Sequence, residues 1–264
     1  MALLFRKAAK TFGLAILTLS IVSWLFLYVD SVYHRRQAER LIAELQSFPF
    51  SSARFLETRD FVNRFGGKPL VQFPDVRLSA PGLPVTDEKG GVHLPAIDKY
   101  PRCDAENCVF QIWLKPKNFV LATKKDSFWF STLLANMGLR PWAAATSFEI
   151  VGGYLKKVTF SVVQTKIANI DGKGLAVQLG YVAVIEEKMI FNGERNEFTV
   201  FAPKISFSTD ALYAMADLNS REAIRRSMDI RIACVSAVFR SCKGFSELAP
   251  SGWAEYSKRN TLQH

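Results

Sequence analysis

The sequence has few of the side chains on which enzyme sites usually depend. It contains only three histidines, His34, His93 and His264, and none of them has the spacing of a metal-ligand pair. It also lacks a Gly-x-Ser-x-Gly elbow, a P-loop and a dinucleotide-binding fingerprint. We therefore expect neither a metal nor a cofactor, and we assign no catalytic residue from the sequence.

Charge is missing from one long segment, Thr11–Val29. A helix of these residues would be about 28 Å long, close to the ~30 Å hydrocarbon core of a bilayer. Trp24 and Tyr28 lie near its end, where aromatic rings favour the headgroup region. We interpret the segment as a transmembrane anchor that binds the lipid bilayer, with a buried core helix as the alternative.

A cleaved signal peptide would begin in the same way, because Arg6, Lys7 and Lys10 precede the apolar segment. However, the apolar run exceeds the usual ~7–15 residues, and no small-x-small cleavage pair precedes Asp30. An uncleaved signal anchor is therefore the preferred interpretation. A type IV pilin start is excluded, since the chain has no Gly-Phe junction followed by a glutamate in the hydrophobic run.

The four cysteines form two close pairs, Cys103/Cys108 and Cys234/Cys242. Pairs of this kind behind a membrane anchor favour two local disulfides in an oxidising compartment. Zinc and free thiols are the alternatives, but structural zinc prefers two to four residues between paired ligands. Three basic residues flank each side of the anchor, so only the cysteines give an orientation. They predict a cytoplasmic segment 1–10, a span 11–29 and an extracytoplasmic remainder.

The chain beyond residue 34 is basic, with 31 Lys and Arg against 23 Asp and Glu, a net charge of +8. Beside a membrane, such a surface favours anionic lipid or an envelope partner over nucleic acid. The basic segment Arg35–Arg40 lies next to the predicted span. An ordinary solvated basic surface is the alternative explanation.

Periodicity and capping residues predict helices after the anchor and then strands. The helices run from Tyr33 to a stop at Pro49, over Ala53–Phe65 with Ser52 as N-cap, from Asp126 or Ser127 to Met137, and from Asn219 or Ser220 to about Phe239. The strands are Val109–Leu114, Phe148–Ile150, Tyr154–Thr165, Ala176–Glu187, Phe198–Phe201 and Ile205–Ser208.

Short turns between these strands, including Gly152-Gly153, predict an antiparallel meander. One apolar face of this sheet should pack against the helices predicted over residues 126–137 and 220–239. The expected fold class is therefore α+β. Juxtamembrane helices over residues 30–67 should precede the disulfide-containing domain, residues 68–264.

Several short motifs resemble a group of uncharacterised bacterial single-pass membrane-anchored proteins with two short-spaced cysteine pairs. These motifs are the basic juxtamembrane helix, NRFGG ending at Gly67, the Cys108-Val-Phe strand start and Cys234…Cys242-x5-Leu-x-Pro. The region Thr165–Phe207 resembles the group less. The resemblance implies a membrane location and disulfides, and it implies no activity.

Three sets of residues are weak candidates for a site. They are His93, the carboxylates Glu186, Glu187, Glu194 and Glu197, and the aromatic residues Trp113, Phe128, Trp129, Phe130 and Trp142. Solvated loop charges and ordinary core packing explain the last two sets more simply.

The absence of a catalytic pattern favours a membrane-tethered, non-catalytic envelope module that contacts a protein partner or the anionic membrane surface. The alternative is a membrane-anchored hydrolase with a carboxylate or histidine site.

Overall fold

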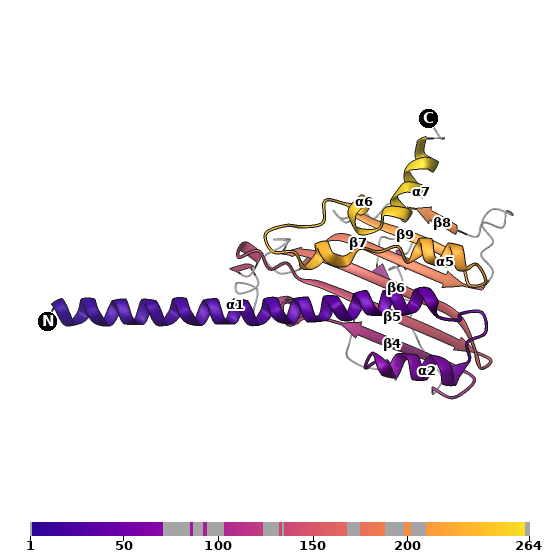
Figure 1. Cartoon of the computed structure of the whole chain (residues 1–264), viewed down its shortest axis with the longest axis horizontal. Helices are drawn as coiled ribbons and strands as arrows, with labels where there is room; N and C mark the ends of the chain where they lie inside the picture. The colour runs from indigo at the N-terminus through magenta and orange to yellow at the C-terminus, as the bar shows by residue number, and fades with distance from the viewer. Residues whose placement is uncertain are drawn as a thin grey trace.

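The structure is a computed structural model that describes residues 2–70, 85–86, 92–93, 103–123, 132–133, 135–167, 175–187, 198–201 and 210–261. Helices cover one face of a twisted sheet, and a long helix extends from the domain at its amino-terminal end (Figure 1). This arrangement confirms the α+β class. The predicted strand Ile205–Ser208 and the predicted caps Asp126 and Ser127 lie outside the described residues.

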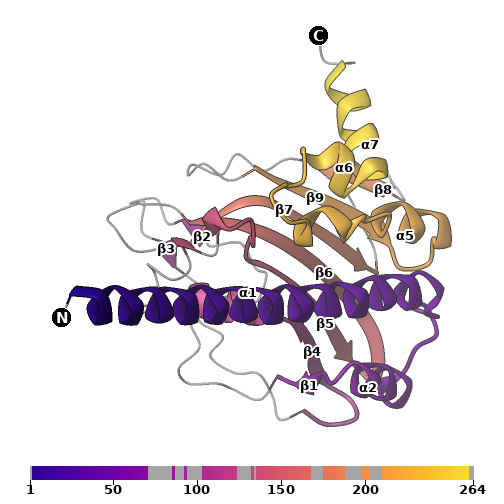
Figure 2. The ribbon, with the colours of Figure 1, turned by 60° about the vertical axis from the view of Figure 1, so that its left-hand side comes forward.

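The first helix, α1, runs without a break over Ala2–Ser47. The sequence predicted a span and a separate helix from Tyr33, but no Gly or Pro lies between them to end the first one. As predicted, the helix stops just before Pro49. Its second half lies across the sheet (Figures 1 and 2), where Ala38, Leu41 and Leu45 are completely buried.

Seven of the described strands form one sheet in the order β1-β4-β5-β6-β7-β9-β8. Their bounds are β1 Lys68–Pro69, β4 Cys108–Leu114, β5 Trp142–Val151, β6 Tyr154–Ile167, β7 Leu175–Glu186, β8 Phe198–Phe201 and β9 Asp210–Asp217. A separate pair joins β2, Val85–Thr86, to β3, Val92–His93.

The prediction of a purely antiparallel meander was wrong for one pair of strands. β9 lies parallel to β7 and stands between β7 and β8. Sequence reasoning missed β9 altogether. Its sequence, DALYAMAD, is rich in alanine, a helix former, although Leu212, Ala214 and Ala216 do alternate toward the buried face. The sheet is therefore mixed.

The β5–β6 hairpin turns at Gly152 and Gly153, as predicted. Both glycines have positive φ, 61° and 76°, as a two-residue type I′ turn requires. Alternate residues beyond the turn, including Phe148, Phe160 and Val162, are fully buried beneath the helices. The two antiparallel strands thus form the centre of the core.

The other helices that the structure describes are short. They are α2 Phe55–Arg64, α3 Lys117–Thr123, α5 Arg221–Ser227, the 3₁₀ helix η2 Ile232–Ser236, α6 Phe245–Leu248 and α7 Pro250–Thr261. The predicted cap of α2 at Ser52 was wrong, since the helix begins after Arg54, whose N–H donates to Glu57 Oε2 at 2.9 Å. The predicted stop at Gly66 is confirmed by its φ of 68°.

The helix predicted from Ser220 to Phe239 is much shorter. Ser220 does cap α5, accepting the Ala223 N–H at 3.3 Å, but α5 ends at Ser227. The chain then leaves the helix because the Arg231 N–H donates to Leu248 O at 2.8 Å. Phe239, the approximate end of the predicted helix, is 75% exposed. The sheet is covered by α1, α2 and α5, so one of the two helices first expected, 220–239, is present in a shortened form. The other, 126–137, lies largely outside the described residues.

Both predicted disulfides are present within the described residues. Cys103–Cys108 has a Cα–Cα distance of 4.3 Å, and Cys234–Cys242 has one of 4.8 Å. The second bond closes the segment that follows η2 and carries Phe239. No free cysteine is left.

Candidate functional site at the junction of helix and domain

Residues 10–22 of α1 are exposed on all sides of the helix. Its large apolar residues from Phe12 to Val22 are about half exposed or more. Among the described residues, one helix is long and apolar enough to cross a membrane, and it is this one. Figure 1 shows the first half of α1 extending alone from the domain.

The domain closes around α1 from Trp24 onward. Trp24 Nε1 donates to Met137 O at 3.0 Å, and the Trp24 ring stacks on Tyr28 with 5.5 Å between centroids. Leu27 is only 4% exposed and forms a small apolar cluster with Leu139. We call the surrounding domain segments the collar. It consists of the start of α3, Leu133, Met137–Arg140 and the tip Val238–Phe239.

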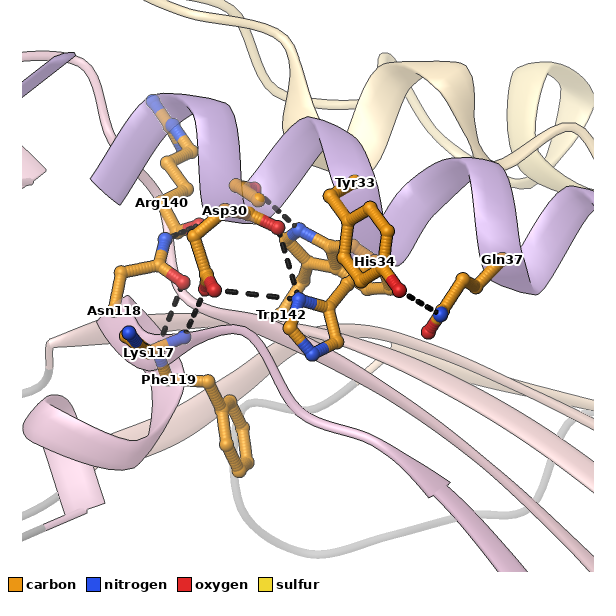
Figure 3. Close-up of polar contacts among 10 residues, drawn as sticks. Asp30, Tyr33, His34, Gln37, Lys117, Asn118, Phe119, Arg140 and Trp142 are labelled. Atoms are coloured by element: carbon orange, nitrogen blue, oxygen red, sulfur yellow. Dashed lines mark hydrogen bonds and ion pairs between the residues drawn. The ribbon is translucent and has the colours of Figure 1, made fainter. Parts of the chain in front are cut away.

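A polar cluster fixes the next turns of α1 against the domain (Figure 3). Asp30 Oδ2 accepts the Lys117 N–H at 2.6 Å, which satisfies the first free donor of α3. The Asp30 backbone oxygen lies 2.9 Å from His34 Nδ1. Trp142 Nε1 donates to Ser31 Oγ at 2.9 Å, so a fully buried sheet residue holds the helix directly.

Asn118 extends the cluster into the collar. It is buried, and its Nδ2 donates to Arg140 O at 3.1 Å while its Oδ1 accepts the Phe119 N–H at 2.8 Å. The side chain therefore ties α3 to the segment that precedes β5. Buried polar groups that are fully paired in this way favour one arrangement over others.

Two further contacts continue along α1. Arg35 Nη1 donates to Ser236 Oγ at 3.2 Å, and Gln46 Nε2 donates to Met228 O at 2.9 Å. Together with Trp24, these contacts attach α1 to the domain over more than twenty residues. The helix is consequently a part of the domain and not a loose tether.

Two arginines of the basic segment beside the predicted span form ion pairs within α1. Arg35 Nε lies 3.5 Å from Glu39 Oε1, and Arg40 Nε lies 2.8 Å from Glu44 Oε1. A further cation, Lys117, lies near the end of the span: its Nζ is 4.3 Å from the centroid of Phe26. Beside it in sequence, partial burial lowers the pKa of Lys115.

The weak catalytic candidates do not converge where the structure describes them. His34 contacts Asp30 in α1, His93 is described only as backbone in β3, and His264, Glu194 and Glu197 lie outside the described residues. Within the described ranges, no group of three His, Cys, Asp or Glu residues is placed to hold a metal ion.

Glu186 and Glu187 form cross-strand ion pairs instead of a paired-carboxylate site. Glu187 Oε2 lies 2.5 Å from Lys156 Nζ, and Glu186 Oε2 lies 3.1 Å from Lys157 Nζ. All four side chains are partly exposed to solvent. They are the solvated charges that the simpler interpretation predicted.

The aromatic residues do not form one cleft where they are described. Trp142 is completely buried beneath α1, whereas Trp113 pairs in register with Ala145 and lies on the other face of the sheet. Phe128, Trp129 and Phe130 lie outside the described residues. Trp142 is therefore a core residue that also holds the junction.

Sequence reasoning missed the junction. Its only signals were the carboxylate of Asp30 directly after an uncharged segment and the aromatic pair Trp24 and Tyr28. The aromatic residues were expected at a membrane interface, but their partner Met137 is 113 residues away. No local pattern predicts a contact at that separation.

The chain was compared with protein-family models, with curated proteins and with solved structures, and no family model, curated protein or solved structure matches it. The resemblance to bacterial membrane-anchored proteins therefore stays a prediction from short motifs.

Proposed function

We propose that this protein is a membrane-tethered, non-catalytic envelope module. Residues 11–29 anchor it as an uncleaved span, residues 1–10 stay in the cytoplasm, and residues 30–264 form a domain outside. The domain is held against the membrane surface at a fixed height and orientation, because its anchor helix is also a helix of its core.

The observation that carries this proposal is the contact between the apolar segment and the domain. Trp24 is hydrogen-bonded to Met137, and Leu27 is buried against Leu139. A signal peptide is removed and makes no lasting contact with the mature domain. Here the end of the apolar segment completes a cluster in that domain, so retention of the segment is favoured over cleavage.

The two disulfides support the orientation. Bonds of this kind persist in oxidising compartments and are rare where glutathione keeps thiols reduced. Cys103–Cys108 and Cys234–Cys242 both belong to the domain that follows the span. A domain on the cytoplasmic side would lose them.

Reporter fusions to the carboxyl end of the full chain test the topology. We expect an active alkaline phosphatase and a dark cytoplasmic fluorescent reporter. The intact mass of the membrane-extracted protein should also include residues 1–29. A fluorescent reporter, or a mature chain that begins near residue 30, would contradict the proposal.

A matched pair of leucine substitutions controls for unrelated effects on expression. Leu19 lies near the centre of the span and is 69% exposed, and Leu56 lies in α2 and is 58% exposed. Leu19→Arg places a charge near mid-bilayer, at a cost of about 2.5–3.5 kcal/mol, and should reduce membrane insertion. Leu56→Arg should leave insertion unchanged.

A further inference from the structure

The free part of α1 is too short to cross a bilayer by itself. Between Thr11 and Val22, before the domain begins to cover the helix, the uncharged segment has 12 residues and a length of about 18 Å. The hydrocarbon core is about 30 Å thick. Tilting the helix would only reduce the thickness that it spans.

Two arrangements would reduce the difference between the length of the free segment and the thickness of the hydrocarbon core. In the first, Lys10 and Lys7 enter the hydrocarbon from the cytoplasmic side, where charged groups are strongly unfavourable. In the second, the collar sinks toward the acyl chains, so that the membrane also covers part of the helix beyond Val22, which the domain surrounds. The second arrangement needs a collar with apolar groups on its outer surface.

The collar has such groups. Phe239 is 75% exposed and Leu133 is 44% exposed. Leu133 O accepts the Met137 N–H, so Leu133 lies one helical turn before Met137. Met137 is the residue whose backbone oxygen accepts the Trp24 Nε1–H. Phenylalanine and leucine side chains are favourable at the boundary between headgroups and acyl chains.

Phe239 is also held in an unfavourable backbone conformation. Its φ is 58°, the left-handed region that bulky residues rarely adopt. The Cys234–Cys242 disulfide closes the loop that carries Phe239. The Phe239 N–H donates to Gly138 O at 3.2 Å. A Cβ on Gly138 would lie 2.6 Å from Phe239 Cδ1, so glycine is needed beneath the ring. The fold thus fixes the outward position of this aromatic side chain.

The position of Lys117 indicates how deep the collar lies in the membrane. Lys117 Nζ lies over the Phe26 ring, whereas the Met137–Phe239 side of the collar meets α1 at Trp24, about 3 Å nearer the membrane centre. Lysines near the ends of membrane helices extend their ammonium groups to the headgroups. With headgroups at Lys117, the Met137–Phe239 side is the deeper side of the collar, and Phe239 and Leu133 are its exposed large apolar residues.

We propose that the collar is a lipid-embedded surface, in which Phe239 and Leu133 insert into the extracytoplasmic leaflet of a phospholipid bilayer and Lys117 contacts its headgroups. This inference rests on the proposed membrane anchor. It goes further by assigning lipid as the partner of a surface that belongs to the folded domain.

Photo-crosslinking of the full chain in vesicles of phosphatidylcholine and phosphatidylglycerol tests this surface. The photoreactive residue p-benzoylphenylalanine replaces Phe239 in one variant and Leu133 in a second. Tyr154 is the matched control, because it is 47% exposed and lies at the β5–β6 turn beside Arg54, near α2 at the far end of the sheet. Peptide mapping of the two disulfides confirms that each variant is folded.

After irradiation, we expect lipid adducts by mass spectrometry at positions 239 and 133, and none above the dark control at 154. Flotation of the vesicles measures anchoring separately. A chain that floats without lipid adducts at 239 and 133 overturns the collar and leaves the anchor standing. Adducts to a second protein copy in place of lipid also overturn it. A chain that fails to float overturns both proposals.

Discussion

Removing the domain half of α1 should unfold the sheet, although no strand is cut. We compare two soluble fragments, residues 30–264 and residues 48–264. The longer fragment keeps Leu41, Ile42 and Leu45, which are buried against the sheet. The shorter fragment loses all three and also leaves Met228 O and Ser236 Oγ without their donors from α1.

The magnitude follows from the buried side chains. Each fully buried Leu or Ile contributes about 1.5–3 kcal/mol, so these three contribute roughly 5–9 kcal/mol. A domain of this kind has a total stability of about 5–15 kcal/mol. The loss is therefore comparable with the whole free energy of unfolding, and fragment 48–264 should not fold.

Near-ultraviolet circular dichroism and thermal unfolding measure the outcome. Fragment 30–264 should show fixed aromatic signals and one cooperative transition, and fragment 48–264 should show neither. In the longer fragment, Leu41→Ala should cost about 2–5 kcal/mol, whereas the matched Leu56→Ala on the exposed face of α2 should cost less than about 0.5 kcal/mol. The reasoning is refuted if fragment 48–264 unfolds cooperatively within about 1 kcal/mol of the longer one.

Three further substitutions test the core. Tyr181→Phe removes the hydroxyl that donates to Ser227 O at 2.8 Å and should cost about 1–3 kcal/mol in urea unfolding; an unchanged midpoint would contradict it. Gly67→Ala should lower the thermal midpoint markedly, because its Cβ would lie 2.4 Å from Val62 Cγ1; equal midpoints would show that the site relaxes. Replacing Cys234–Cys242 by serines should cost about 2–3 kcal/mol, and peptide mapping that found free thiols in the native protein would refute the bond.

Local signals were sufficient where the structure is local. The Gly152-Gly153 turn, the Ser220 cap and both disulfides join residues that are close in sequence, and the residues themselves show the conformations they need. The same holds for β8. In each case a short motif was enough to predict the local structure.

The wrong or missing predictions concern residues whose structure depends on partners that are distant in sequence. The apolar stripe beyond α5 was interpreted as more helix, but Arg231 pairs with Leu248 and the disulfide folds the chain back. The parallel pairing of β9 with β7 places β9 between β7 and β8, an order that no turn signal in the sequence marks. The junction was invisible for the same reason, since Ser31 and Trp142 are 111 residues apart.

The position of α1 at the start of the chain also constrains the order of folding. Arg35 and its partner Ser236 are separated by 201 residues, and Gln46 and Met228 by 182. At a synthesis rate of ~5–20 residues per second, the partners of α1 emerge about 10–40 s after the helix itself. Strands β4 to β7 emerge during that interval, but α1 still lacks its partners Met228 and Ser236. The contacts of α1 with residues 228–236 can therefore form only after the central strands of the sheet have been made, and contacts of such large sequence separation slow folding.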